Sequence, residues 1–275
     1  MSDASTPAFS LLDVQIEDGI ARVGLNRPDK RNAINDELLA QLGDCLAHGL
    51  PEARVVVLHG LGAHFCAGLD LHELMAKRSP DVLVGMRRSR QWHKVFDAIQ
   101  FGELPVVSVL KGGVIGGGLE LASATHVRVS EASTFYQLPE GQRGIFLGGG
   151  GSVRIPRIIG PGRVLEMMLT GRSLSSQEGQ QLGLSHYLVP DGQGLDQAMA
   201  LARTIAGNAP ATNYAIVNGI SRIGDMAMSE GFFAETMVTV MTKAAGIGAA
   251  QRIQEFFDGR RQQREQAPTP PTTAS

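Results

Sequence analysis

The sequence predicts an α/β fold in which strands and helices alternate along most of the chain. The segments that begin at Arg54 and Leu104 support this prediction, because each runs from apolar residues through glycines into helix-forming residues. With 275 residues, of which 43% are hydrophobic, the chain is also long enough to bury a real core. We therefore expect a mixed core followed by a helical C-terminal segment.

Composition excludes several classes of partner. The net charge is −2 and the pI is about 6.4, so nothing favours binding to nucleic acid or to an anionic membrane. No apolar run approaches the roughly 20 residues of a bilayer-crossing helix, and the first ten residues lack a signal-peptide pattern. Cys45 and Cys66 are too few for a disulfide framework and are expected to be buried hydrophobes. We expect a soluble, cytoplasmic protein.

The first quarter of the chain is predicted to contain three strands and one helix. Residues 11–25 alternate in polarity around Asp18-Gly19, which is typical of two strands joined by a turn. The stripe of Leu38, Leu39, Leu42 and Leu46 indicates an amphipathic helix. In order, the expected elements are a disordered stretch over 1–10, strands within 11–25, a charged turn over 26–32, a helix capped by Asn35 and ending near Gly49, and a buried strand over 54–59.

The rest of the chain continues the alternation and then becomes helical. The expected elements are an amphipathic helix over 78–101 with Trp92, Val95, Phe96 and Ile99 on its apolar side, a strand over 105–110, an extended run ending at Leu138-Pro139-Glu140, a helix over 161–170 closed by Gly171, a short helix capped by Ser176, a strand over 187–189, and helices from Leu195 with breaks near Pro210, Gly224 and Gly246. The boundary between the core and the helical segment is placed near 200–206, and the tail over 264–275 is expected to be disordered.

Two of the strand-to-helix turns are rich in glycine, and they suggest a site for carbonyl chemistry. Parallel strands need right-handed crossovers, so adjacent units would place two helix N-termini side by side and converge two backbone N–H donors. Glu120 follows one of these turns in the first turn of a short helix, and Glu140 ends a strand-like run 20 residues later. Two donors and two carboxylates around one glycine-lined cavity suit chemistry on a carbonyl compound.

Several motifs together give the chain a specific resemblance over roughly residues 11–263. They are Leu25–Ala33 (LNRPDKRNA), Phe65–Asp70 (FCAGLD), Gly116–Leu121 (GGGLEL), Leu138–Glu140 (LPE), the glycines 148–151, and Leu169–Arg172 (LTGR). With these motifs the chain resembles the crotonase (enoyl-CoA hydratase/isomerase) superfamily, and within it the enoyl-CoA hydratases. The resemblance implies a spiral of repeated ββα units over 11–203, a helical oligomerisation region over 204–263, and assembly into trimers or dimers of trimers.

The resemblance also implies roles for individual residues. The backbone amides of Leu69 and Gly117 would form an oxyanion hole for an acyl-CoA thioester, Glu120 would activate water, and Glu140 would protonate the α-carbon. The implied substrate-contact set is Lys30, Arg31, Ala67, Asp70, Leu71, His72, Gly116, Tyr136, Pro139, Phe256 and Arg260. No cofactor is expected beyond the CoA of the substrate, and no metal, because no His, Cys, Asp and Glu set has ligand spacing.

The chain departs from the family pattern at four places near the expected site. His72 stands where a lysine is common, Thr125-His126 replaces a cysteine-aspartate pair, Tyr136 replaces a glycine, and Gly141 replaces a β-branched or aliphatic residue. These departures bear on the CoA contacts and on the shape of the acyl pocket.

Hydration of a 2-enoyl-CoA is the preferred hypothesis, because few members outside the hydratases keep both glutamates. The enzymatic alternatives are double-bond isomerisation, which needs one glutamate, and hydratase-lyase chemistry on an aryl-propenoyl-CoA, which Tyr136 and Trp92 keep open. A non-catalytic acyl-CoA-binding subunit is a further alternative. Trp92-His93 resembles the 4-chlorobenzoyl-CoA dehalogenase branch, but the nucleophilic aspartate position falls among glycines. Glycoside hydrolysis is disfavoured by an aromatic content of 5%.

Overall fold

The computed structural model describes residues 9–244, 253–254 and 257–258. The chain divides into two compact units, residues 1–208 and 209–275. The first unit holds both sheets, and the described part of the second is a pair of helices. The α/β prediction is confirmed, and the helix before the division, α8 (Gly194–Ala206), belongs with the sheets.

A six-stranded sheet forms the centre of the first unit. Its order is β1-β2-β3-β4-β6-β9, and every pair after the first is parallel. The strands are β1 (Leu12–Glu17), β2 (Ile20–Leu25), β3 (Val55–Gly60), β4 (Val106–Leu110), β6 (Val127–Glu131) and β9 (Tyr187–Val189). The β1–β2 turn is made by Asp18 and Gly19, both with positive φ, as the sequence predicts for a tight hairpin.

A smaller sheet lies beside the first and contains β5 (Gly113–Ile115), β7 (Phe135–Gln137) and β8 (Ser173–Ser175) in the order β5-β7-β8. Neither β5 nor β8 is predicted from the sequence, because each is three residues long and β5 lies within the glycine-rich turn. β5 and β7 are parallel, so the chain leaves both strands at the same edge of the sheet. This edge leads directly into the two glutamate-bearing segments.

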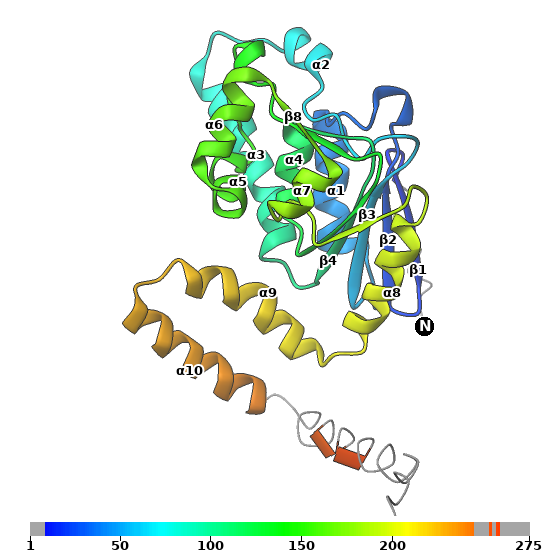
Figure 1. Cartoon of the computed structure of the whole chain (residues 1–275), viewed down its shortest axis with the longest axis vertical. Helices are drawn as coiled ribbons and strands as arrows, with labels where there is room; N and C mark the ends of the chain where they lie inside the picture. The colour runs from blue at the N-terminus through cyan, green and yellow to red at the C-terminus, as the bar shows by residue number, and fades with distance from the viewer. Residues whose placement is uncertain (1–8, 245–252, 255–256, 259–275) are drawn as a thin grey trace, which may run out of the picture. The chain divides into compact units, whose positions relative to one another are not determined.

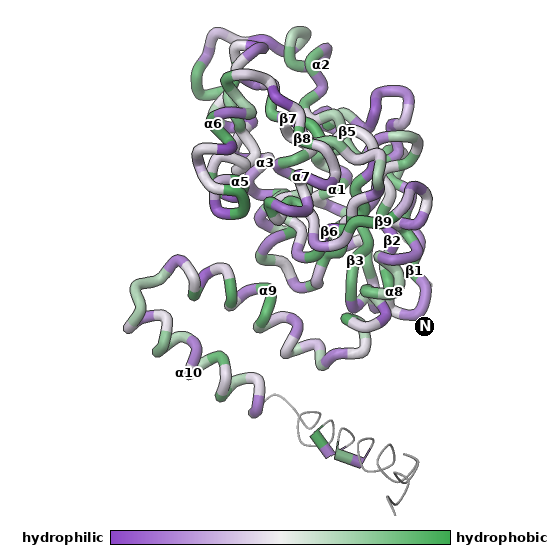
Figure 2. The backbone as a smooth tube through the Cα atoms, in the orientation of Figure 1, coloured by the Kyte–Doolittle hydropathy of each residue, from purple (hydrophilic) through white to green (hydrophobic). Residues whose placement is uncertain are grey.

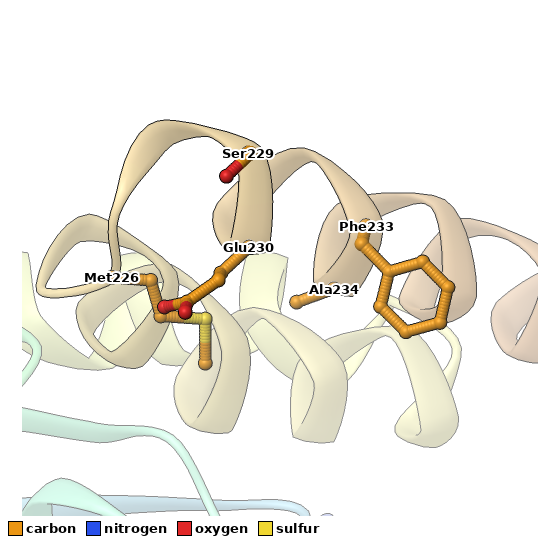
Figure 3. Close-up of a pocket in the computed structure, with 5 residues that line it drawn as sticks. All are labelled: Met226, Ser229, Glu230, Phe233 and Ala234. Atoms are coloured by element: carbon orange, nitrogen blue, oxygen red, sulfur yellow. The ribbon is translucent and has the colours of Figure 1, made fainter.

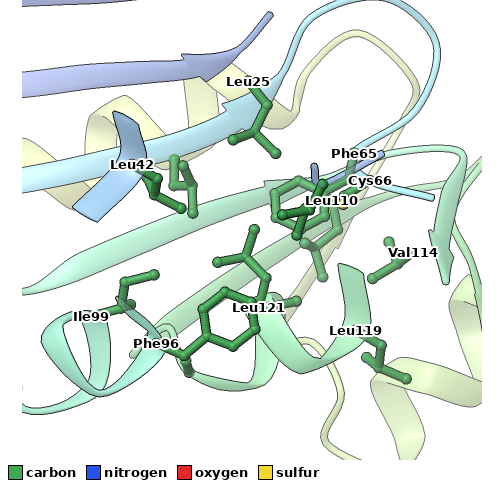
Figure 4. Close-up of a cluster of buried hydrophobic side chains, with 14 of the residues drawn as sticks. Leu25, Leu42, Phe65, Cys66, Phe96, Ile99, Leu110, Val114, Leu119 and Leu121 are labelled. Atoms are coloured by element: carbon green, nitrogen blue, oxygen red, sulfur yellow. The ribbon is translucent and has the colours of Figure 1, made fainter. Parts of the chain in front are cut away.

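The helices of the first unit cover both faces of the large sheet (Figure 1). One face packs on α8 through valines of β3, β4 and β6, which form one buried cluster with alanines of that helix. On the other face, β2, β3 and β4 pack against α1, α3 and α4, and Figure 4 shows part of this larger cluster. In Figure 2, β3 is drawn largely in the hydrophobic colour, as expected for a strand that is covered on both faces.

Helix boundaries mostly follow the capping residues in the sequence. The helices are α1 (Asp36–His48), α2 (Leu71–Ala76), α3 (Val82–Gln100), α4 (Gly117–Ser123), α5 (Gly151–Ile159), α6 (Pro161–Thr170) and α7 (Ser176–Gln181). Asn35 caps α1 by accepting a hydrogen bond from Leu38 N, as predicted. The predicted helix over 78–101 starts later, at Val82, because Asp81 caps it. The cap of α7 is Ser175 rather than Ser176, since Ser175 and Glu178 form a capping box.

The described part of the second unit contains α9 (Pro210–Gly224) and α10 (Met228–Ala244), which pack against each other. The breaks predicted near Pro210 and Gly224 are confirmed; the one near Gly246 lies outside the described residues. Figure 3 shows a small pocket at the start of α10, lined by Met226, Ser229, Glu230, Phe233 and Ala234. Many large apolar side chains of both helices are exposed, namely Ile216, Ile220, Met228, Phe232, Phe233, Met237, Val240 and Met241.

Candidate active site

Two backbone amides from different loops lie side by side. The loop before α2 runs against β5, where Cys66 pairs with Val114 in a parallel bridge. A Cβ on Gly68 would lie 2.9 Å from the amide nitrogen of Gly117, and a Cβ on Gly117 would lie 3.3 Å from that of Leu69. The two loops can approach this closely only because Gly68, at φ +85°, carries no side chain.

Among the described residues, neither of these two amides has a hydrogen-bond acceptor in the backbone network. Leu69 forms a parallel bridge with Ile34, but the hydrogen bonds of this bridge are made by its two neighbours. The Ile34 amide donates to the Gly68 carbonyl at 2.7 Å, and the Asp70 amide donates to the Ile34 carbonyl at 2.9 Å. Gly117 is the first residue of α4, where an amide has no partner within the helix. Two adjacent amide donors at a helix N-terminus can stabilise an oxygen that gains negative charge.

Glu120 is buried on α4, and one of its oxygens is tightly held. Its Oε1 accepts hydrogen bonds from the amides of Gly149 and Gly151, each at 2.8 Å. Burial raises the pKa of this carboxyl, while the glycine amides and the charge of Arg154 act in the opposite direction. The contact is so close that a Cβ on Gly151 would lie 2.5 Å from Glu120 Cγ, so this position needs glycine.

Glu140 is buried three residues after the end of β7, in a less polar setting. Its Oε1 lies 2.5 Å from where a Cβ on Gly116 would be, and its Oε2 has no hydrogen-bond partner among the described residues. Burial, with a further contribution from the charge of Glu120, raises the pKa of Glu140 to about 7. The two glutamates therefore differ in their environments and interact through their charges.

The small sheet fixes the spacing between the two glutamate segments. Ile115 of β5 pairs with Gln137 of β7, and the next amide, Gly116 N, donates to the Gln137 carbonyl at 2.9 Å. Gly116 is the N-cap of α4, which carries Glu120, and Gln137 is three residues before Glu140. Thus a few backbone hydrogen bonds hold both carboxylates at one edge.

Trp92 of α3 forms an aromatic wall beside the amide pair. A Cβ on Gly117 would lie 2.8 Å from Trp92 Cζ3, and one on Gly149 would lie 3.1 Å from Trp92 Cε3. The ring packs edge-on against Phe96, with 5.5 Å between the ring centroids. The sequence placed Trp92 on the apolar side of its helix, and the structure adds that this side faces the glycines near both glutamates.

Most of the substrate-contact residues expected from the resemblance lie on the loops that meet at the amide pair. Lys30 and Arg31 are exposed, and the Arg31 carbonyl accepts a hydrogen bond from the Ala67 amide at 2.9 Å. This bond brings two exposed cations to the loop that carries Leu69. Leu71 is half-buried and His72 exposed in the first turn of α2, whereas Gly116 and Pro139 are buried next to Glu120 and Glu140 in the chain.

Two members of that set have their side chains engaged within the protein. Asp70 forms a salt bridge with Arg27 at 3.1 Å and caps α2 by accepting from the His72 and Glu73 amides. Tyr136 is fully buried in the core, close to Ser130 and Ser185, and its burial raises the pKa of its phenol. The Tyr136 side chain thus packs inside the unit, and its role as a substrate contact stays a prediction.

Other expectations concern residues elsewhere in the chain. Phe256 and Arg260 lie outside the described residues. Within the part that the structure describes, no group of three or more His, Cys, Asp and Glu could hold a metal ion. Both cysteines are buried, and burial raises the pKa of each thiol to about 12.

Two residues that support Glu120 through the glycine segment 148–151 were not predicted from the sequence. Arg154 of α5 and Ser89 of α3 both donate hydrogen bonds to carbonyls of the glycine segment 148–151. The one available signal was the position of Arg154, which lies three residues after that segment between the apolar residues Val153 and Ile155, where a charged side chain needs a partner if it is buried.

The first unit is thus an α/β fold in which two buried carboxylates lie near two adjacent backbone amides, an arrangement that suits chemistry on a carbonyl compound. A family model described as "Enoyl-CoA hydratase/isomerase" matches residues 15–259. The chain therefore belongs to the enoyl-CoA hydratase/isomerase family, within the crotonase superfamily, and is an acyl-CoA-processing enzyme.

Individual relatives agree with this assignment. Enoyl-CoA hydratase EchA19 of Mycobacterium tuberculosis is 31% identical over 224 residues, covering 79% of this chain and 83% of that protein. The fatty acid oxidation complex subunit alpha of Shewanella loihica is 36% identical, but the chain spans only 28% of its length. A solved structure from Rhodopseudomonas palustris CGA009, titled as a candidate enoyl-CoA hydratase, has a TM-score of 0.87 at 46% identity, covering 94% of this chain and 99% of that one. The crotonase fold expected from the sequence is thereby confirmed.

In the described part of the chain, no helix is both long enough and apolar enough to cross a membrane.

Proposed function

We propose that this protein hydrates a 2-enoyl-CoA to a 3-hydroxyacyl-CoA. The observation that carries the proposal is the pair of buried glutamates in unequal environments beside two converging amides. A conjugated thioester becomes electrophilic at its β-carbon when its carbonyl is polarised, and hydration then needs a base and an acid on neighbouring carbons. No cofactor takes part beyond the CoA of the substrate.

In the proposed reaction, Glu120 acts as the base. Its carboxylate takes a proton from water as the water oxygen bonds to the β-carbon. Electrons of the double bond move to the thioester oxygen, which the Leu69 and Gly117 amides stabilise as an enolate. One donor of this kind is typically worth about 10²–10³ in rate.

Glu140 completes the addition by donating its proton to the α-carbon. With a pKa of about 7, this carboxyl still carries a proton over much of the neutral range. In Glu120, burial also raises the pKa, but the Gly149 and Gly151 amides donate to Oε1 and oppose that rise, which favours the ionised form. Two carboxyls with separated pKa values can serve as acid and base in one step.

The direct test is the absorbance of the conjugated thioester, measured with short-chain, long-chain, branched and aryl 2-enoyl-CoA substrates. We expect the absorbance to fall as a 3-hydroxyacyl-CoA accumulates, with the product identified by mass. Conversion of a 3-enoyl-CoA without uptake of water would instead support isomerisation. Release of an aldehyde from an aryl substrate would support a hydratase-lyase, and binding without turnover would reject the enzymatic proposal.

We also propose that the chain assembles into a homotrimer or a dimer of trimers. Exposed apolar side chains on α9 and α10 support this, because a monomer in water rarely exposes so many large apolar residues in one helical pair. Phe232 and Phe233, for example, are 62% and 70% exposed.

A further inference from the structure

Ser89 of α3 is connected to Glu120 through one peptide unit of the glycine segment 148–151. Its Oγ donates to the Gly148 carbonyl at 2.6 Å. The N–H of the same peptide unit belongs to Gly149, and it donates to Glu120 Oε1 at 2.8 Å. Hydrogen bonds linked in series through a peptide polarise one another, so the serine hydroxyl strengthens the donor that faces the carboxylate.

Arg154 of α5 fastens the next peptide unit of the same segment. It is buried, and its guanidinium donates to the Gly149 carbonyl at 2.9 Å, to Gln100 Oε1 at 2.5 Å and to Asp97 Oδ1 at 2.6 Å. Gln100 and Asp97 both belong to α3. The arginine therefore ties the glycine segment to the helix that also supplies Ser89.

The backbone of the segment explains why it needs these supports. Gly150 has a φ of +94°, and a Cβ there would collide with the Arg154 guanidinium. This conformation turns the amides on either side, Gly149 and Gly151, toward the same carboxylate oxygen. A run of glycines gains the most conformational freedom when released, so external bonds are needed to keep both amides aimed at Glu120.

We propose that Ser89 and Arg154 are positioning residues, which hold the glycine segment so that two of its amides converge on Glu120. Neither side chain is assigned a contact with substrate. The inference rests on the proposed function only in taking the ionised form of Glu120 as the working base; the geometric claim stands apart from which reaction follows.

Loss of either support should raise the pKa of Glu120. The charged groups that act on its carboxylate are Arg154 on α5 and Glu140 after β7, with Asp97 of α3 behind the arginine. Amide donation stabilises the ionised form, so misdirected amides leave burial less opposed and raise the Glu120 pKa further. A smaller fraction of the enzyme then carries the base in its active form at acid pH.

The test replaces Ser89 with alanine and follows Glu120 directly by carbon-13 NMR of labelled glutamate carboxyls, with the signal assigned from its loss in Glu120→Gln. We expect Ser89→Ala to titrate at higher pH than the wild type and to move the acid limb of kcat upward. The variant loses the hydrogen bond from Ser89 to the Gly148 carbonyl, and the net energy of one such bond corresponds to a roughly three- to tenfold lower kcat, with KM little changed. Ser89→Thr, which keeps the hydroxyl, should restore both properties.

A second pair of variants tests the arginine. Arg154→Met should shift the Glu120 titration in the same direction, and Arg154→Lys should recover part of the shift. Arg157→Met is the matched control, because Arg157 is exposed on the same helix and donates a hydrogen bond to the Val153 carbonyl at 2.9 Å. If Arg154→Met fails to fold, Ser89→Ala still decides the proposal, since it removes one oxygen from a half-buried residue.

An unchanged Glu120 titration in folded Ser89→Ala would overturn the inference, even if the wild type proves to be a hydratase. The opposite combination is also informative. If the wild type shows no hydration but Ser89→Ala still shifts the titration, the proposed function is lost and the positioning role stands.

Discussion

Glu120 and Glu140 are the same residue type, yet their surroundings favour different roles in the proposed reaction. Glu120 Oε1 has two amide donors, whereas Glu140 Oε2 is buried without a partner among the described residues. Hydrogen bonding to the ionised form favours it, and burial without such bonds favours the neutral acid. The proposed acid and base roles thus depend on backbone placement rather than on side-chain chemistry.

Glu120→Gln separates the candidate reactions. Glutamine cannot take a proton from water, so hydration should fall by about 10²–10⁴-fold, the usual contribution of a positioned acid or base. An isomerase that shuttles its proton through Glu140 alone would keep much of its activity. The assay is absorbance with a 2-enoyl-CoA and a 3-enoyl-CoA in parallel, and Glu103→Gln, at an exposed position, is the control.

The pH profile should show an alkaline limb near pH 7. Glu140 must be protonated to donate to the α-carbon, and its pKa is raised to about 7, so kcat/KM for hydration should decline as the pH rises past that value. The measurement is initial rate across the neutral range with one buffer system. A flat profile through pH 7 to 9 would remove Glu140 from the acid role, whereas the limb should disappear in Glu140→Gln along with most of the activity.

The raised pKa of Glu140 should make the folded protein less stable at neutral and alkaline pH than at acid pH. Its folded pKa is above the ordinary value of 4.5, so the folded protein holds a proton that the unfolded chain has lost, and stability falls as the pH rises from about 4.5 to about 7. At about 1.4 kcal/mol per pKa unit, the cost above pH 7 is on the order of 3 kcal/mol. Glu140→Gln should therefore raise the unfolding free energy at pH 8 and have little effect at pH 4.5. Equal effects at both pH values would contradict this assignment.

At the scale of elements, the sequence predicted the long and regular parts. The hairpin at Asp18-Gly19, the Asn35 cap and the apolar side of α3 all appear where the pattern placed them, because each depends on neighbouring residues alone. The strands β5 and β8 could not be found in this way. Each has three residues and exists through pairing with β7, a contact between segments distant in the chain.

The parts of the candidate site that depend on neighbouring residues were predictable from the sequence, and the parts that depend on contacts between distant segments were not. The glycine turns and the two glutamates are visible in the sequence, and their meeting follows from parallel strand order. The burial of Tyr136 was not visible, because its hydroxyl lies beside Ser130 and Ser185, which only the folded core brings together. Nor could the sequence show that Ser89 would reach a carbonyl 59 residues further along the chain.

Gly141 allows the segment after Glu140 to pack closely against α6. A Cβ at this position would collide with the Met168 carbonyl of α6, so the absence of a side chain lets the segment after Glu140 pack on that helix. Gly141→Val should destabilise the fold by about 1–3 kcal/mol through overpacking, measured by denaturant unfolding. Gly162→Ala is the control in α6, where a Cβ has open space and should have a neutral or slightly stabilising effect. A neutral Gly141→Val would show that α6 can move aside.

For the whole molecule, the helical pair of the second unit should govern assembly. Replacing Phe232 and Phe233 with serine removes large exposed apolar surface, and we expect the mass in solution, measured by light scattering, to fall from that of a trimer or hexamer toward that of the 29.3 kDa chain. Phe146→Ser is the matched control, because Phe146 is 71% exposed but belongs to the first unit. A wild-type protein that is already monomeric would reject the proposed assembly.

The parallel pairing of β5 with β7 has a consequence for how the enzyme could acquire new substrates. Because the short β5–β7 pairing fixes the spacing of both carboxylates, the carboxylates can act on two adjacent carbons of a substrate whatever the rest of its acyl chain is. Variation in the acyl tail has to be accommodated by another part of the fold, and α3, with Trp92 beside the amide pair, is separate from that pairing. Descendants of this protein could therefore change the α3 side chains that do not support the glycine segment, keeping Ser89, Asp97 and Gln100, while the reacting atoms stay in register.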